Sequence, residues 1–146
     1  MHTPGTALAD QFKGDWASYL SAIENQTDVA VIGVTDYMSI TNYSRMLAEK
    51  ASGRLANIAL LIPNIEFRVT PETAKAKALN LHLLVDPSSS SHEVEILKAL
   101  QRLVFKMDGE PFGCVPDDLT RLGYKHDPSI KDDGAALRHG TNQFKV

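Results

Sequence analysis

Apolar residues recur along the chain with two different periods, and these periods predict alternating helices and strands. A stripe at positions i, i+3, i+4 and i+7, typical of a helix, consists of Trp16, Tyr19, Leu20 and Ile23. Asp15 precedes this stripe and is of a residue type that caps helix N-termini. Residues 29–34 form instead a continuous apolar run rich in β-branched residues, typical of a strand that is covered on both faces. The first part of the chain therefore predicts a helix followed by a strand of a parallel sheet.

The alternation continues through the middle of the chain. A second helix is expected to begin at Ser39 or Thr41 and to end at Gly53, since these residue types favour the two ends of a helix. The other elements expected here are strands over residues 58–62 and 79–85, the first continued past Pro63 to residue 67, and a short helix over residues 71–78.

The strongest helical pattern lies in the second half of the chain. Ser90 and Glu93 have the spacing of a capping box, in which each side chain satisfies a free backbone N–H of the first turn. The apolar stripe that follows them consists of Ile96, Leu97, Leu100, Leu103 and Val104. From Gly109 onward turn residues are more frequent. The elements expected there are a short helix over residues 117–122 stopped by Gly123, a helix over residues 132–139 and the start of a strand at residues 144–146.

Strands that alternate with helices predict a parallel α/β architecture with right-handed crossovers. A closed barrel and an open sheet both satisfy this pattern. In either arrangement, catalytic groups lie at the C-terminal ends of the strands and in the loops after them. Polar residues at those positions are therefore the candidates for chemistry.

Composition and charge narrow the possible functions. The formal net charge is −3, from 15 basic and 18 acidic residues, so no overall positive field holds nucleic acid or an anionic membrane. The single cysteine, Cys114, excludes an internal disulfide framework and a zinc site built from cysteines, and it fits a reducing cytosol. No apolar run approaches the roughly 20 residues that span a bilayer. We therefore expect a cytoplasmic protein without a membrane partner.

Three ionisable residues lie at the ends of predicted strands, flanked by apolar side chains that would desolvate them. They are Asp36, Glu66 and His82. A divalent cation would stabilise all three, because carboxylates and neutral imidazoles are its usual ligands. Each residue also has a simpler interpretation. Asp36 could cap a turn, Glu66 could face solvent opposite Ile65 and Phe67, and His82 could be a structural histidine.

Four short segments in order along the chain resemble motifs of the PHP (polymerase and histidinol phosphatase) family. Residues 1–5, Met-His-Thr-Pro-Gly, match the end of an Asp-Leu-His-x-His-Thr motif, and residues 33–37, Gly-Val-Thr-Asp-Tyr, match Ile/Val-Thr-Asp-His. Residues 63–67, Pro-Asn-Ile-Glu-Phe, and residues 81–84, Leu-His-Leu-Leu, match an Ile-Glu motif and a His-Leu-Leu strand. The chain is thus similar to a PHP domain over residues 1–86.

The resemblance implies a fold, a cofactor and a reaction. The fold would be part of a distorted (βα)7 TIM-like barrel with parallel strands. Its trinuclear centre of zinc, manganese or iron would hydrolyse phosphoesters. The metal-site residues carried over are His2, Asp36, Glu66 and His82, with Glu66 bridging two ions. In the second motif, however, the usual ligand is the histidine after the aspartate, where this chain has Tyr37.

Other family ligands have no counterpart here. The first histidine of the opening pair and the later Ala-His-Pro and Asp-x-His motifs are missing from the sequence. Residues 1–146 are therefore expected to be a partial PHP domain, truncated at the N-terminal metal motif and on its C-terminal side. Such a piece is expected to have little activity by itself and to self-associate.

Three further segments resemble PHP domains fused to a P-loop ATPase in bacterial anti-phage defence. They are residues 12–16, 122–124 and 143–146. This similarity implies an ATPase domain in the same protein and a phosphoester substrate such as nucleic acid. The strand edges that a partial barrel would expose predict a homo-oligomer. Two alternatives remain open: a PHP fold without catalysis that serves in regulation or oligomerisation, favoured by Tyr37, and a plain α/β binding domain without metal.

Overall fold

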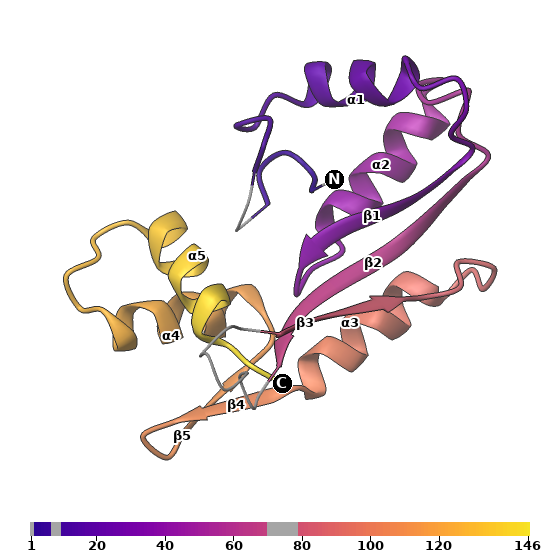
Figure 1. Cartoon of the computed structure of the whole chain (residues 1–146). Helices are drawn as coiled ribbons and strands as arrows, with labels where there is room; N and C mark the ends of the chain where they lie inside the picture. The colour runs from indigo at the N-terminus through magenta and orange to yellow at the C-terminus, as the bar shows by residue number, and fades with distance from the viewer. Residues whose placement is uncertain (1, 7–9, 70–78) are drawn as a thin grey trace. The chain divides into compact units, whose positions relative to one another are not determined.

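The computed structural model describes residues 2–6, 10–69 and 79–146, and the chain divides into two compact units (Figure 1). The first unit comprises Met1–Ile65 and Leu83–Glu93, and the second comprises Glu66–His82 and Val94–Val146. Strand β2 (Leu60–Val69) belongs to both units, because the division falls between Ile65 and Glu66. The units are described separately below.

The first unit contains the predicted helix, strand and helix in order. They are α1 (Trp16–Glu24), β1 (Val31–Tyr37) and α2 (Thr41–Ala51). The prediction that Asp15 caps α1 is confirmed, since its carboxylate accepts a hydrogen bond from the Ser18 backbone N–H at 3.0 Å. Ser39 Oγ accepts one from the Thr41 N–H at 3.1 Å, just before α2. The fully buried side chains of this unit's core include Tyr19, Leu20, Tyr43, Met46 and Ile58.

The second unit contains a β-hairpin that the helical interpretation of its sequence missed. Helix α3 (His92–Arg102) ends before Val104, which begins β4 (Val104–Met107), and β5 (Glu110–Gly113) pairs with β4 in antiparallel register. The connecting residues Asp108 and Gly109 have φ angles of 52° and 80°. Positive φ at both central positions is the requirement of a type I′ turn, and Asp-Gly is a favoured sequence for it.

Two helices, α4 (Pro116–His126) and α5 (Asp133–Gln143), pack closely against each other in the second unit. A Cβ atom on Gly123 would lie 1.9 Å from the Ala136 carbonyl oxygen, and one on Gly140 would lie 1.7 Å from that of Leu119. The prediction that Gly123 stops a helix is therefore wrong. Gly123 and Gly140 lie inside their helices because only glycine permits this approach of the two backbones.

The barrel prediction is contradicted by the arrangement of the strands. The described residues form a three-stranded sheet of order β1-β2-β3, where β3 is Leu79–Leu84, and the two-stranded hairpin β4-β5. Strand β3 runs opposite to β2 (Figure 1), so the sheet is mixed rather than parallel. Two small sheets of this kind do not make a (βα)7 TIM-like barrel, which needs parallel strands closed into a ring.

The remaining sequence predictions fall at the ends of this sheet. The strand expected over residues 58–62 was predicted to continue past Pro63 to residue 67. Strand β2 does run through Pro63 without interruption. Residues 144–146 do not form a strand, although the Val146 N–H donates to the Arg68 carbonyl at 2.9 Å. The short helix expected over residues 71–78 lies outside the described residues. Across the ranges that the structure describes, no helix is long and apolar enough to cross a membrane.

Candidate functional site

Asp36 lies near the end of β1, with its side chain almost completely buried in the first unit. Its Oδ1 accepts hydrogen bonds from the Thr3 hydroxyl and from Asn42 Nδ2, the latter at 3.2 Å. Asn42 Nδ2 also lies 2.8 Å from Thr3 Oγ1, which closes a small polar network between the N-terminal segment, β1 and α2. Asp36 therefore has neutral protein donors around it.

Burial raises the pKa of Asp36, and the hydrogen bonds from Thr3 and Asn42, together with the nearby Thr6 hydroxyl, oppose this rise. The Thr6 hydroxyl is near enough to act on the carboxyl group. Its geometry nevertheless falls short of a hydrogen bond, and Asp36 Oδ2 accepts none from the residues that the structure describes. The carboxyl group thus has one well-satisfied oxygen and one that is buried without such a bond.

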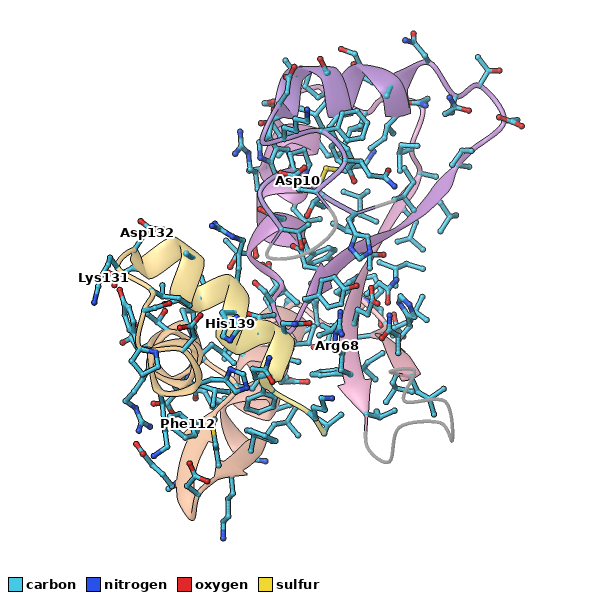
Figure 2. All side chains as sticks on the ribbon, turned by 60° about the vertical axis from the view of Figure 1, so that its left-hand side comes forward. Asp10, Arg68, Phe112, Lys131, Asp132 and His139 are labelled. Carbon is cyan, nitrogen blue, oxygen red and sulfur yellow. The ribbon has the colours of Figure 1, made fainter. Side chains whose placement is uncertain are left out.

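The N-terminal segment that carries Thr3 is organised by a second carboxylate, that of Asp10 (Figure 2). Its oxygens accept hydrogen bonds from the backbone N–H groups of Gly5, Phe12 and Gly14, at 2.8, 3.0 and 2.8 Å. A carboxylate that gathers several N–H groups fixes the path of a loop that has no regular secondary structure. Asp10 therefore helps to hold the loop from which Thr3 reaches Asp36.

His2 lies beside β1, on the opposite face of this strand from Asp36. It forms an isolated parallel bridge with Thr35, and its ring stacks on Tyr37 at 5.1 Å between centroids and an interplanar angle of 7°. Thr35 and Tyr37 share one face of the strand, and Asp36 projects from the other because successive side chains alternate. The structure therefore brings the His2 ring to Tyr37, the residue that stands where the PHP motif has histidine.

Glu66 lies in the second unit on β2, where its side chain is only 3% exposed. The solvent-facing interpretation of this residue is wrong, although it does project opposite Ile65 and Phe67 as the strand period requires. Asn80 Nδ2 on β3 donates a hydrogen bond to Glu66 Oε1. His82 Nε2, also on β3, lies 4.0 Å from Glu66 Oε2.

His82 is more exposed than its apolar neighbours in the sequence suggested. Its side chain is 45% exposed, so the flanking leucines of β3 do not desolvate it. The Leu81 and Leu83 side chains are themselves about half exposed, at 52% and 45%. Glu66 and His82 therefore combine a buried carboxylate with an imidazole that solutes can reach.

Of the predicted site residues, His2 and Asp36 belong to the first unit, and Glu66 and His82 belong to the second. Nowhere in the described ranges do three or more His, Cys, Asp or Glu side chains gather closely enough to hold a metal ion. Within the second unit, His82 Nε2 and Glu66 Oε2 place an imidazole nitrogen and a carboxylate oxygen 4.0 Å apart.

Comparison with known proteins adds no assignment. The chain matches no family model, no curated protein and no solved structure.

The sequence interpretation missed the asparagines that hold the two carboxylates. Asn80 lies two residues before His82 and therefore on the same face of β3. Strand alternation alone would thus have placed Asn80 near Glu66, the partner of His82. Asn42 lies in the first turn of α2, six residues after Asp36, and no local pattern links the two. Only the turn between β1 and α2, which contains Met38 with a φ of 52°, brings Asn42 back to the strand.

Proposed function

We propose that the chain contributes to a metal-dependent phosphoesterase, in which Glu66 and His82 bind a divalent cation such as zinc, manganese or iron. The observation that carries this proposal is the buried Glu66 carboxylate, 4.0 Å from the accessible imidazole of His82. A buried carboxylate is costly unless it is paired or hydrogen-bonded. Asn80 donates a hydrogen bond to one oxygen of this carboxylate, and carboxylate oxygen and imidazole nitrogen are usual ligands of these metals.

The two side chains fit a metal ion by distance and by chemistry. Bonds from zinc to imidazole nitrogen and carboxylate oxygen are each about 2.0–2.2 Å long. The separation of 4.0 Å between His82 Nε2 and Glu66 Oε2 is therefore within reach of one ion placed between them. Asn80 would keep the carboxylate oriented through its hydrogen bond to the other oxygen, Oε1. Further ligands would come from water or from the substrate.

A divalent cation at such a site lowers the pKa of a bound water and stabilises charge on phosphoryl oxygens. The half-exposed ring of His82 leaves the site open to a phosphoester, and the buried carboxylate keeps its position when the substrate enters. The resemblance to PHP domains supports this reaction. It also supports nucleic acid as the substrate and a P-loop ATPase as the partner domain in a defence protein.

A specific observation favours a second candidate, a PHP-like module that has lost catalysis and serves in regulation or oligomerisation. Tyr37 occupies the histidine position of the second motif, and its ring is stacked on that of His2. A phenol is a poor replacement for imidazole as a ligand at neutral pH, because its ordinary pKa is about 10. In this case the Glu66 and His82 pair would bind an ion without hydrolysing a phosphoester.

Substitution of Glu66 by glutamine tests both candidates. Loss of an outer-sphere partner alone costs about 10- to 100-fold in metal affinity, and loss of a direct ligand costs at least as much. Glu66→Gln should therefore lower Mn²⁺ affinity by about tenfold or more, measured by equilibrium dialysis with elemental analysis, and His82→Ala should have a smaller effect if Glu66 bridges two ions. Hydrolysis of a chromogenic phosphodiester in Mn²⁺ is measured on the same samples.

The matched control is Glu95→Gln, which removes an exposed carboxylate from α3. It should leave both Mn²⁺ affinity and hydrolysis unchanged. Equal Mn²⁺ binding by the wild type and Glu66→Gln, with circular dichroism showing both folded, would contradict the metal role of Glu66. Binding that depends on Glu66 without any hydrolysis would favour the module that has lost catalysis.

A further inference from the structure

Two histidines that lie outside the predicted site form a close pair in the second unit. His126 Nδ1 and His139 Nε2 are 2.8 Å apart, and the ring centroids are separated by 4.8 Å. His126 is the last residue of α4, and His139 lies on α5 (Figure 2). A neutral imidazole has one N–H and one lone pair, so one ring donates to the other.

The helices that carry the pair are held firmly in register. Gly123 precedes His126 by less than one turn, and Gly140 directly follows His139. At both glycines the opposing backbone is so close that a Cβ would overlap a carbonyl oxygen. The Tyr124 hydroxyl also donates to Asp133 Oδ1 at 2.6 Å and links the same two helices. The two imidazoles are therefore positioned by the backbone contact and not merely by their own hydrogen bond.

A carboxylate stands beside the two rings. Asp127 follows His126 directly and caps the end of α4. Its Oδ1 accepts hydrogen bonds from the Ser129 backbone N–H at 3.0 Å and from the Ser129 hydroxyl at 2.6 Å, which fix the position of the carboxylate next to His126 in the chain. An anionic neighbour of this kind favours a cation at the imidazole pair.

We propose that His126 and His139 form a surface binding site for a divalent cation of the imidazole-preferring kind, namely Cu²⁺, Ni²⁺ or Zn²⁺. The ion would take the place of the hydrogen between His126 Nδ1 and His139 Nε2. The ring that donates this hydrogen shifts to its other tautomer, with the proton on its second nitrogen, so no proton is released. Water completes the coordination, and Asp127 supplies negative charge.

The geometry requires only a small adjustment. With metal–nitrogen bonds of about 2.0–2.1 Å, two tetrahedral ligands are roughly 3.3 Å apart. The nitrogens at 2.8 Å must therefore separate slightly, and the exposed position of the pair allows such ring rotation. Imidazole ligands suit copper, nickel and zinc better than magnesium or calcium, which prefer oxygen.

The test is a titration of the full chain with Zn²⁺ alone. Calorimetry measures the affinity, and ¹⁵N NMR records the signals of the histidine rings. We expect the signals of His126 Nδ1 and His139 Nε2 to shift together on zinc binding. His126→Gln and His139→Gln should each lower the affinity of this step by about tenfold or more, as expected for a lost ligand. Glu66→Gln should leave it unchanged, which separates this site from the proposed phosphoesterase site.

His92→Gln is the matched control, because it removes an imidazole from elsewhere in the chain, where its Nε2 lies 2.9 Å from the Tyr43 hydroxyl. It should leave the zinc shifts of His126 and His139 intact. The proposal is overturned if those two ring signals do not respond to Zn²⁺. It is also overturned if both glutamine variants, folded by circular dichroism, bind Zn²⁺ at this step as the wild type does.

Discussion

At the scale of single residues, Glu24 at the end of α1 holds both a guanidinium group and a backbone N–H with its carboxylate. Its carboxylate accepts hydrogen bonds from Arg54 Nε at 2.7 Å and Arg54 Nη2 at 2.8 Å, and from the Leu55 backbone N–H at 2.9 Å. Leu55 is completely buried and has a φ of 55°, in a region that a leucine rarely adopts. Glu24 therefore holds a strained turn as well as a guanidinium group.

These contacts predict a change of stability with pH. The hydrogen bonds from Arg54 and Leu55 lower the pKa of Glu24 from 4.5 to about 2. Because the pKa is lower in the folded state, the contribution is fully present above pH 4.5 and is lost as the pH falls toward about 2. Glu24→Gln should remove this part of the pH dependence, as measured by urea unfolding at a series of pH values.

Glu49→Gln serves as the comparison. Glu49 Oε1 lies 3.8 Å from Arg45 Nε on the surface of α2, which is a longer separation than that between Glu24 and Arg54. A surface pair of this kind contributes little to stability. The acid sensitivity of this variant should resemble that of the wild type. If Glu24→Gln loses stability with acid as steeply as the wild type, the bonds to Arg54 and Leu55 are not what stabilises the turn.

At the scale of elements, the contact between α4 and α5 depends on glycine at two positions. The carbonyl oxygens of Leu119 and Ala136 occupy the space that a Cβ would need at Gly140 and Gly123. Protein interiors are too closely packed to absorb even one added methyl group without a shift. The helices would have to move apart, and the pair His126 and His139 would separate with them.

Gly140→Ala should therefore destabilise the chain by about 1–3 kcal/mol, the usual cost of overpacking a well-filled contact. Urea unfolding at neutral pH measures it. Gly134→Ala in the same helix is the control, because its Cβ would meet only side-chain atoms, at 3.3 and 3.5 Å. There the better helix propensity of alanine should make the change neutral, or stabilising by up to about 1 kcal/mol. Equal stability of the two variants would show that the helices do not need this close approach.

The helices and strands were largely predictable because their signals are local. Asp15 marks the start of α1, and the run before Asp36 marks β1. Gly123 was misread because glycine ends helices more often than it lines a contact between them, and the partner Gly140 is distant in sequence. The Asp108-Gly109 turn did have a local signal, which the apolar stripe continuing to Val104 concealed.

The candidate site was predictable only in part, since burial depends on strands that are far apart in the sequence. The alternation of β2 placed Glu66 opposite Ile65 and Phe67, but only the neighbouring β3 shows that the carboxylate is buried. The apolar neighbours of His82 suggested a desolvated ring, whereas β3 is exposed along its whole length. The metal role of His2, Asp36, Glu66 and His82 stays a prediction.

At the scale of the whole molecule, β3 is an exposed strand at the end of the order β1-β2-β3. Its leucines, which are between 45% and 59% exposed, are Leu79, Leu81, Leu83 and Leu84. Leu79, Leu81 and Leu83 share one face, because they are two residues apart. An apolar edge strand of this kind is a template for pairing with another chain.

We therefore expect the chain to self-associate at high concentration, and Leu81→Lys with Leu83→Lys to lower this association by placing charge on the strand. Sedimentation velocity over a range of concentrations measures the effect. Gln101→Lys adds a charge at an exposed position of α3 without removing an apolar side chain, and should leave the association unchanged. If the Gln101→Lys variant dissociates as readily as the double variant, net charge and not β3 controls the association.

The hairpin β4-β5 also bears on the order in which contacts form as the chain folds. Its strands pair residues 3 to 9 positions apart, from Met107 with Glu110 to Val104 with Gly113. Hairpins form in about 1–10 μs, because little chain entropy is lost in closing so short a loop. Thr3 meets Asp36 only across 33 positions. When the complete chain refolds from denaturant, the hairpin can therefore form before the contact between Thr3 and Asp36 does.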